Sequence, residues 1–488
     1  MQAYTRSTAP TDTHSIIEQE VIPMKKTMKM TIAILASLAI LLTCASCALK
    51  KETQTATAAP DSAEALNAEP VVTVDESGST VITLDGTTAS VSGVGAETDG
   101  STVLIKQGGT YTVRGTLTDG RIVVDADDAD VTINLSGANI TCANSSAIYV
   151  YKAKTATVYA AEGTENTLTD GQTYAYTDSY ASQADEEPNA CLYSKADLIL
   201  AGSGSLTVNG QQGNGVTAKD TLTVGTLTLT VNATGNGVTG KDSLTVKDAN
   251  VTVKAGTEGS DEGGKGLKSD GSIAVAGGTI SLDCTDDGIH AEENVTIADG
   301  KLTIQSGDDA VHAENTVTVE SGTLSLDGHE GLEATLVTMN GGAVSIKATD
   351  DGINAAQQID GVTPTVTIND GELTIEMGQG DTDGIDANGD IIINGGTIRV
   401  TAQSPFDYDG KGELNGGTVY VNGEQVTELT NQFGGMGGGR MGGFGGQDGS
   451  GRPEGFTRPD GSGEQGGGFP SEGRGKMRTE TSGSGQSA

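Results

Sequence analysis

Aromatic and basic side chains are scarce in this chain of 488 residues. It has no tryptophan, five phenylalanines and 11 tyrosines, which argues against a flat aromatic platform of the kind that stacks on crystalline cellulose. Only 28 basic residues face 66 acidic ones, so the net charge is -38. Nucleic acid is therefore excluded as a partner, because its phosphates need lysine and arginine. The acidic surface is compatible with multivalent cations, or with acidic ligands bridged by them.

Cysteine is also rare, and its spacing gives no disulfide framework. Cys142, Cys191 and Cys284 stand far apart in the middle of the chain. We expect them to be small apolar residues of the interior. With so few aromatic residues, that interior must be built from valine, isoleucine, leucine and alanine.

The most informative feature that is present is a repeat of about 22 residues. In each unit a polar residue precedes a small residue and then an aliphatic one. The aliphatic positions are Val216, Val238, Leu267, Ile289, Val311, Leu332, Ile353 and Ile385. A fixed period of this size indicates a solenoid, in which each unit buries its apolar face against its neighbours.

Each unit contains short runs, such as 294–297, in which apolar and polar residues alternate. This alternation predicts short, half-buried strands that are separated by turns. Three strands per period without a helix predict an all-β chain, a single-stranded right-handed parallel β-helix over residues 71–430. Leucine-rich repeats have a similar period, but they need an L-x-x-L-x-L pattern with a helix or an asparagine column, which we do not find in the sequence.

The first part of the chain reads as a targeting segment. Residues 1–23 are interpreted as an upstream mis-start, and residues 24–46 as a lipoprotein-type signal peptide whose apolar stretch is too short to span a bilayer. Cys47 is the predicted lipidation site, with Cys44 and plain secretion as the alternatives. We expect the protein on the extracellular face of a bacterial membrane, which it would touch only through its lipid anchor.

Low-complexity segments flank the predicted β-helix, and a few insertions interrupt it. Residues 47–70 are predicted to be a linker, and the glycine-rich residues 434–488 a disordered tail. Extra residues at 174–189, 256–264 and 378–383 break the period. They are predicted to form loops on one face of the solenoid, which is often the binding face. The protein is expected to be a monomer.

Alignment of the units on the aliphatic residue places carboxylates in columns along one edge. At the strand spacing of about 4.8 Å, two unit charges repel by about 3.5 kcal/mol at an effective dielectric of about 20. Raised pKa values or bound cations would relieve this, and clusters of oxygen ligands select calcium. The predicted calcium ligands are Asp286, Asp287, Asp308, Asp309, Asp350, Asp351, Asp383 and Asp386. The plain alternative for any single Asp-Asp-Gly is turn chemistry, in which aspartate precedes glycine for backbone reasons.

Further candidate ligand-binding residues are Tyr174, Tyr176, Tyr180, Lys268, His290, His312 and Glu333. The tyrosines gather near the irregular stretch at 174–189, where their rings could stack on sugars or simply cover a loop. His290 and His312 lie one coil apart and could bind a soft metal, although solvated edge residues are the favoured interpretation.

Several ordered motifs together resemble a known family. They are Asn189-Ala-Cys-Leu-Tyr-Ser-Lys-Ala-Asp-Leu, Gly202-Ser-Gly-Ser-Leu-Thr-Val, the repeated Asp-Asp-Gly-Ile units and Ser404-Pro-Phe-Asp-Tyr-Asp-Gly. Over residues 75–433 the chain resembles the bacterial carbohydrate-binding-domain family of cell-surface β-helix proteins. The resemblance implies a right-handed β-helix related in fold to pectate lyases. It also implies binding of plant-type polysaccharide, including acidic pectin, and calcium held by the aspartates named above.

Three functions stay open at this point. The favoured one is a non-catalytic surface lipoprotein that binds polysaccharide, with calcium bridging its carboxylates to those of a uronate. A calcium-dependent polysaccharide lyase would need an arginine or lysine base beside the calcium, and the few basic residues nearby form no recognisable catalytic set. A structural or adhesive stalk is the third, because fold alone does not define function. No catalytic residue is predicted.

Overall fold

The structure, a computed structural model, describes residues 74, 77–259, 263–356, 358–378 and 382–431. The regular secondary structure identified within these residues consists of β-strands alone. Among the described residues, no helical segment is long and apolar enough to cross a membrane. The predicted mis-start, signal peptide, lipidated Cys47, linker and tail all lie outside the described residues.

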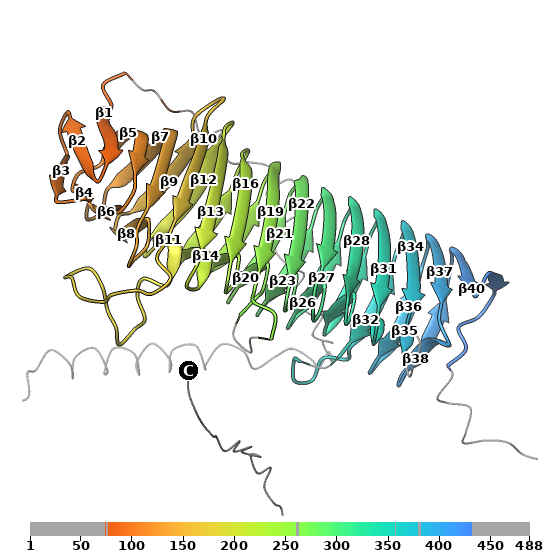
Figure 1. The fold of residues 1–488 in the computed structure, drawn as a ribbon. Helices are drawn as coiled ribbons and strands as arrows, with labels where there is room; N and C mark the ends of the chain where they lie inside the picture. Colours follow the sequence, from red (N-terminus) through yellow and green to blue (C-terminus); the bar gives the residue numbers. More distant parts are fainter. Residues whose placement is uncertain (1–73, 75–76, 260–262, 357, 379–381, 432–488) are drawn as a thin grey trace, which may run out of the picture. The chain divides into compact units, whose positions relative to one another are not determined.

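The chain divides into two compact units. Unit 1 contains the described residues up to Val253, together with Lys268–Ile280 and Thr296–Lys301. Unit 2 contains Lys254–Leu267, Ser281–Val295 and the described residues from Leu302 onward. Within each unit, strands of successive coils lie side by side (Figure 1).

A coil consists of three short strands, and each belongs to one of three sets. The first set is β3 (Ala96–Asp99), β4 (Thr102–Ile105), β6 (Arg121–Asp125), β8 (Ile148–Lys152), β11 (Ala190–Ser194), β14 (Asn214–Ala218), β17 (Val238–Gly240), β20 (Leu267–Ser269), β23 (Ile289–Ala291), β26 (Val311–Ala313), β29 (Leu332–Ala334), β32 (Asp351–Ala355), β35 (Asp383–Ala387) and β38 (Ser404–Tyr408). The second set is β9 (Thr155–Ala160), β12 (Asp197–Gly202), β15 (Thr221–Val224), β18 (Ser243–Val246), β21 (Ser272–Val275), β24 (Asn294–Ile297), β27 (Thr316–Val319), β30 (Leu336–Met339), β33 (Thr365–Ile368), β36 (Asp390–Ile393) and β39 (Gly412–Leu414).

The third set completes each coil. It is β10 (Glu165–Thr169), β13 (Ser205–Gly210), β16 (Thr228–Ala233), β19 (Ala249–Ala255), β22 (Gly278–Cys284), β25 (Lys301–Gln305), β28 (Thr323–Gly328), β31 (Ala343–Ala348), β34 (Glu372–Met377), β37 (Thr397–Thr401) and β40 (Thr418–Val421). The remaining strands are β1 (Thr80–Gly86), β2 (Thr88–Ser92), β5 (Gly109–Leu117), β7 (Asp130–Thr141) and β41 (Glu424–Val426). Antiparallel pairs occur at the two ends, β1 with β2, β3 with β4 and β40 with β41.

Between coils the pairing is parallel and in register, so like residues stack on like. In unit 1, Leu198 pairs with Leu222. In unit 2, Leu324 pairs with Val344 and Leu326 with Ile346, and all of these side chains are buried. The intervening threonines and serines point outward, which is why each strand alternates apolar and polar residues. The prediction of an all-β parallel β-helix is therefore confirmed.

Two smaller expectations are also settled by the strands and their packing. Cys142, Cys191 and Cys284 are buried and form no disulfide, as expected. Our statement that the sequence has no asparagine column is wrong. In unit 2 the side-chain amide of Asn369 donates to Asn340 (2.8 Å), that of Asn394 to Asn369 (2.8 Å), and that of Asn415 to Asn394 (3.0 Å). The unequal chain spacing of these residues hid the ladder.

The glycines of the Asp-Asp-Gly units are needed for space rather than for a turn. Gly352 does not have a positive φ. A Cβ on it would lie 2.4 Å from the carbonyl oxygen of Gly384 and 2.6 Å from Cγ2 of Ile375. Gly331 is confined in the same way, by Gly352 and Ile346. Turn chemistry therefore does not account for these glycines, and close packing of successive coils does.

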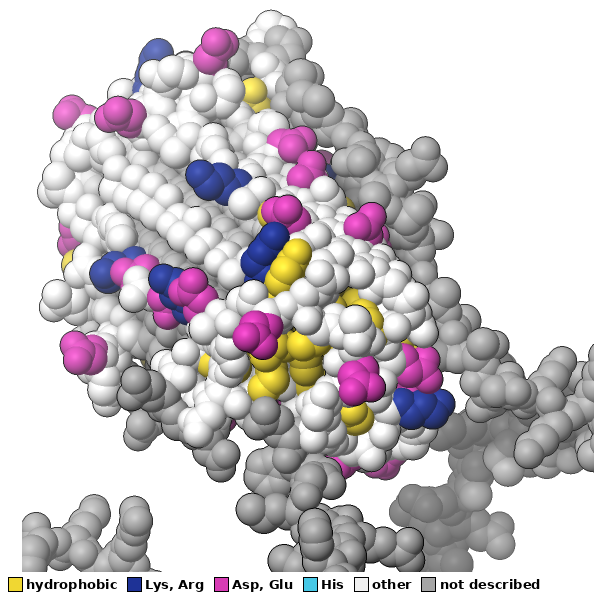
Figure 2. Space-filling view, turned by 90° about the vertical axis from the view of Figure 1, so that its right-hand side faces the viewer, with side chains coloured by type: hydrophobic (Ala, Val, Ile, Leu, Met, Phe, Trp, Pro, Cys, Tyr) yellow, Lys and Arg dark blue, Asp and Glu magenta, His cyan; other side chains and the backbone are white. Residues whose placement is uncertain are grey.

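Charged side chains are scattered over one face of the molecule. Figure 2 shows the side that lies on the right in Figure 1, where acidic groups and fewer basic groups are spread among uncharged atoms. Dense clustering of carboxylates is a property of one edge of unit 2, which is described below.

Replacement of Gly352 by alanine should lower the free energy of unfolding by about 1–3 kcal/mol, because the new methyl group overpacks the contact between coils. Gly378→Ala is the matched control. It has no positive φ, and its added Cβ would make only ordinary contacts of 3.5–3.6 Å. Thermal and urea unfolding of both variants measure the difference. Equal stability of the two variants would contradict the packing explanation.

Candidate cation and glycan site

Polar side chains form two columns along one edge of unit 2. The turn column lies at or just before the start of the strands of the first set and consists of Lys265, Asp287, Asp309, Glu330, Asp351 and Asp383. The strand column begins three residues after Asp287 and consists of His290, His312, Glu333, Asn354, Asp386 and, one coil further, Asp407. Strand register fixes the second column, since His290 pairs with His312 and His312 with Glu333.

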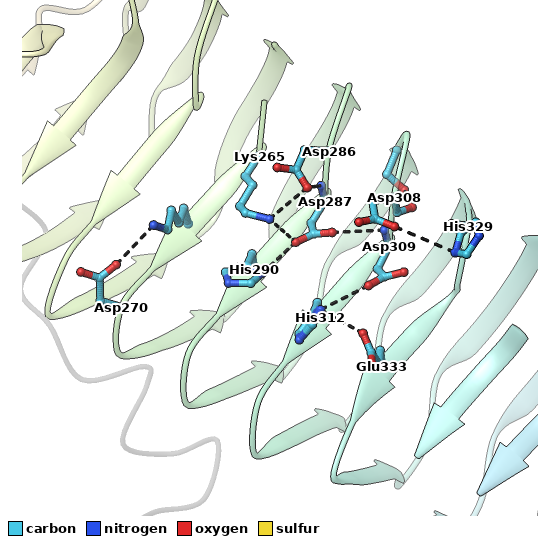
Figure 3. Close-up of polar contacts among 12 residues, drawn as sticks. Lys265, Asp270, Asp286, Asp287, His290, Asp308, Asp309, His312, His329 and Glu333 are labelled. Atoms are coloured by element: carbon cyan, nitrogen blue, oxygen red, sulfur yellow. Dashed lines mark hydrogen bonds and ion pairs between the residues drawn. The ribbon is translucent and has the colours of Figure 1, made fainter. Parts of the chain in front are cut away.

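At the start of the turn column a lysine neutralises the first aspartate pair. Nζ of Lys265 lies 3.0 Å from Oδ1 of Asp286 and 2.5 Å from Oδ2 of Asp287 (Figure 3). Nδ1 of His290 lies 2.7 Å from the same Oδ2 of Asp287. Burial would raise the pKa of Asp287, but the hydrogen bonds from His290 and Lys265 outweigh it and lower that pKa to about 2. Asp287 is therefore an ionised carboxylate.

The next coil places a histidine between two carboxylates. Nδ1 of His312 lies 3.2 Å from Oδ2 of Asp309 and 3.0 Å from Oε2 of Glu333 (Figure 3). Burial disfavours the imidazolium, yet the two hydrogen bonds raise the pKa of His312 to about 10. We call Asp287, His290, Asp309, His312 and Glu333 the histidine cluster. Its two histidine side chains are only 15% and 17% exposed, so our interpretation of them as solvated edge residues is wrong.

A more exposed row lies outside the turn column. It consists of Asp286, Asp308, His329 and Asp350. His329 lies 3.9 Å from Asp308 on one side and 3.9 Å from Asp350 on the other, and all three side chains are about half exposed. Ion pairs of this length at the surface contribute little to stability.

Beyond the histidine cluster the columns present only oxygen donors to an ion. We call this part the oxygen-donor end. It consists of Glu330, Asp351, Asn354, Thr382, Asp383, Asp386, Ser404 and Asp407. Within this set there is no lysine, arginine or histidine.

Four buried oxygens of the oxygen-donor end have no hydrogen-bond partner: Glu330 Oε2, Asn354 Oδ1, Thr382 Oγ1 and Ser404 Oγ. Buried polar atoms normally have a partner, and an ion is one recognised explanation for an exception. The donor set is that of calcium, which takes six to eight oxygen ligands. By this criterion the oxygen-donor end fits calcium. Asp286 and Asp287 do not fit it, because an ammonium group and an imidazole nitrogen surround them instead of further oxygen donors.

The pKa values of these carboxyl groups are raised, as expected for acidic groups that are buried together. Burial, with Glu333 and Asp309 nearby, raises the pKa of Glu330 to about 9. Burial also raises the pKa of Asp351 to about 7 and that of Asp386 to about 6, each with help from neighbouring aspartates. Without a cation, these groups ionise only at a cost to the fold.

The aspartates predicted as calcium ligands thus fall into four environments. Asp286 and Asp287 are paired with Lys265, and Asp308 and Asp350 lie in the exposed row. Asp309 contacts His312 in the histidine cluster. Asp351, Asp383 and Asp386 lie in the oxygen-donor end. Sequence reasoning missed Glu330, Asn354, Thr382, Ser404 and Asp407 as one group. Extension of the alignment by one more coil would have found Ser404 and Asp407, which pair with Asp383 and Asp386.

The predicted tyrosines lie elsewhere, and Lys268, three residues after Lys265, belongs to unit 1. Tyr174 is buried and donates to Asp170 (2.6 Å), so its ring is not offered to a ligand. Tyr176 lies against Tyr174. Lys268 is 3.4 Å from Asp270. Tyr180 packs edge-on against Tyr151 beside a buried cluster that contains Tyr149 and Tyr193, which supports the interpretation as loop cover.

Tyr180 also lines a polar cavity of about 450 Å³ in unit 1. Arg121 and Asn144 line the same cavity. The guanidinium of Arg121 is engaged, since it donates to Ser145 (2.8 Å) and to Asp178.

Fold and edge together define a class of protein, a parallel β-helix that carries stacked carboxylates and histidines on one edge. The family of carbohydrate-binding domain-containing proteins matches residues 99–382 and 265–428. These segments span well over half of the chain, so the chain belongs to this family, and the predicted family is confirmed.

Comparison with known proteins gives one relative and one solved structure. A carbohydrate-binding domain-containing protein of Acetivibrio thermocellus is 37% identical over 132 residues, which are 27% of this chain and 45% of that protein. The match thus spans a little under half the length of this relative. Among solved structures, the gadolinium derivative of a polysaccharide lyase-like protein from C. thermocellum aligns over 68% of this chain and 99% of that chain, at 21% identity and a TM-score of 0.32.

Stability without a cation should fall as the pH rises, and Glu330→Gln should reduce this fall. The folded pKa of Glu330, about 9, lies above its ordinary value of 4.5. Its stabilising contribution is therefore complete below about pH 4.5 and is lost as the pH rises towards about 9. Between about pH 5 and pH 8 the wild-type melting temperature should drop about 2–4 °C more than that of Glu330→Gln. This corresponds to a loss of roughly 1 kcal/mol in the free energy of unfolding.

The measurement is thermal unfolding in the presence of a chelator. Glu372, an exposed residue at the start of β34, provides the control variant Glu372→Gln, which should follow the wild type. An identical pH dependence for wild type and Glu330→Gln would show that Glu330 is not held protonated.

Proposed function

We propose that the protein is a non-catalytic, surface-anchored polysaccharide-binding protein that recognises uronate-containing, plant-type glycans such as pectin through calcium. Membership of the carbohydrate-binding family supports glycan binding. The observation that carries the calcium part of the proposal is the set of buried, partnerless oxygens at the oxygen-donor end. Calcium held there would also accept the carboxylates of the glycan, which explains how an acidic protein attracts an acidic ligand.

The set of residues assigned to calcium differs from the set that the sequence suggested. Glu330, Asp351, Asn354, Asp383 and Asp386 supply carboxylate and amide oxygens from three successive coils of one edge. Thr382 and Ser404 add hydroxyls. Spacing along the edge follows the coil repeat, so an extended glycan lying along it would meet similar groups at regular intervals.

A binding role is favoured over a lyase by the state of the basic groups. β-Elimination at a uronate needs a base that can accept a proton beside the bound carboxylate. Lys265 is the basic residue of the turn column, and Asp286 and Asp287 already bind its ammonium group. Burial tends to lower the pKa of Lys265, but these two aspartates outweigh it and raise that pKa, which makes the amine a poorer base.

The wild-type protein should bind polygalacturonate only with calcium present. The double variant Asp351→Asn/Asp386→Asn should weaken the affinity at least about 10-fold, or about 1.4 kcal/mol in binding free energy. The substitution keeps the shape of both side chains and removes their charge. Titration calorimetry of the full chain measures binding. Ultraviolet absorbance of the same samples reports any unsaturated product of a lyase reaction.

The control variant is Asp370→Asn, an exposed aspartate of unit 2 away from the columns, and it should bind as the wild type does. Growing absorbance from unsaturated sugar would replace this proposal with a calcium-dependent lyase. Absence of both heat and absorbance with polygalacturonate would contradict uronate binding and favour a structural or adhesive stalk.

Surface anchoring gives a separate prediction for Cys47. Cys47→Ser should abolish incorporation of a labelled fatty acid and release the protein from the membrane fraction of a bacterial host, because thioether attachment of lipid needs the thiol. Cys44→Ser is the matched control and should leave labelling unchanged. The reverse pattern would assign the anchor to Cys44, and unlabelled wild-type protein would indicate plain secretion.

A further inference from the structure

We infer that the histidine cluster is a binding site for a borderline divalent transition metal of the zinc class, distinct from the calcium proposed at the oxygen-donor end. Three ligand atoms, a carboxylate oxygen of Asp287 and one ring nitrogen each from His290 and His312, lie within 4.8 Å of one another. A second such group, Asp309, His312 and Glu333, shares His312 with the first. This inference does not depend on the proposed glycan function.

The donor chemistry differs between the two parts of the edge. Imidazole nitrogen suits zinc, copper, nickel and iron, whereas carboxylate and carbonyl oxygens suit calcium and magnesium. The strand column changes from histidine at His290 and His312 to oxygen donors from Glu333 onward. One edge therefore presents two donor sets with different cation preferences.

Carboxylates orient both histidines as they do in many metal sites. A metal-bound histidine usually gives its other ring N–H to a carboxylate, which fixes the tautomer and the direction of the ring. Nδ1 of His290 is held by Asp287 at 2.7 Å, and Nδ1 of His312 by Asp309 and Glu333 at 3.2 and 3.0 Å. The two rings lie 4.9 Å apart at their centroids (Figure 3).

An unsatisfied atom is the independent sign of a missing ligand. Nε2 of His312 is buried and has no hydrogen-bond partner. An ion-pair network with Asp309 and Glu333 explains Nδ1 of this ring but leaves Nε2 unexplained, and an unmade hydrogen bond in the interior is costly. A metal ion accounts for both ring nitrogens, one as its ligand and the other as the oriented N–H.

Lys265 competes for the same carboxylate. Lys265 comes from the coil before Asp287, whereas His312 comes from the coil after it. The ammonium group of Lys265 contacts both Asp287 and Asp286. Binding of a doubly charged ion should therefore shift Lys265 towards Asp286, where it keeps one partner. Asp309 and Glu333 supply the additional negative charge that a divalent ion needs at this point.

Cobalt(II) is the probe for this site, because its visible absorption reports nitrogen and carboxylate ligation directly. The chelator-treated full chain is titrated with cobalt(II) and then with zinc(II) as competitor. The wild type should develop cobalt absorption that zinc abolishes and that excess calcium leaves in place. His312→Gln should weaken cobalt binding at least about 10-fold, as the loss of ligands or of their orienting partners does in other sites.

His329→Gln is the matched control. This histidine also neighbours carboxylates, Asp308 and Asp350, but it lies in the exposed row, and its loss should change the affinity less than about two-fold. His290→Asn is the second variant, used alongside melting temperatures in case His312→Gln fails to fold. The inference is overturned if cobalt gives no absorption, if His290→Asn and His312→Gln bind like the wild type, or if calcium displaces cobalt.

Discussion

Parallel, in-register stacking of coils is the constraint on which the rest of the molecule depends. Because each strand hydrogen-bonds to its equivalent in the next coil, each residue lies about 4.8 Å from the residue at the same position of that coil, which is often of the same type. For apolar residues this is favourable, and ladders such as Leu324–Val344 build the core. Asparagines also gain, since the side-chain amides of Asn369 and Asn394 each donate to one neighbour of the ladder and accept from the other. Stacked carboxylates, in contrast, repel one another and destabilise the fold.

The acidic edge of unit 2 deals with this repulsion in different ways along its length. Lys265 neutralises the first pair of aspartates, and histidines intervene at the next two coils. Asn354 replaces a charged group beside Glu330 and donates to it at 3.1 Å. Beyond that point nothing in the described columns carries a positive charge, and buried oxygens remain without partners. The two ions that we propose, calcium at the oxygen-donor end and a zinc-class ion at the histidine cluster, would complete this gradient.

Period and alternation were enough to predict the β-helix, because both are written into single positions such as Ile289 and Val311. The columns could be predicted for the same reason. The partner of each side chain within a column could not be predicted, since the choice between Lys265 and an ion as the partner of Asp287 depends on how far the side chains reach. Burial of His290 and His312 depends on neighbouring turns that the sequence does not position. Unequal insertions between coils, as between Asn340 and Asn369, hid the asparagine ladder and the membership of Ser404 in the oxygen-donor end.

The confined glycines of the acidic edge have a consequence for how such proteins change over generations. Gly331 and Gly352 each abut the backbone of the following coil, so a coil with a small residue at this point can follow any other such coil. Duplication or loss of one coil would then lengthen or shorten the row of ligands without a redesigned interior. Valency towards a long polymer becomes a quantity that selection can adjust in whole steps, one coil at a time.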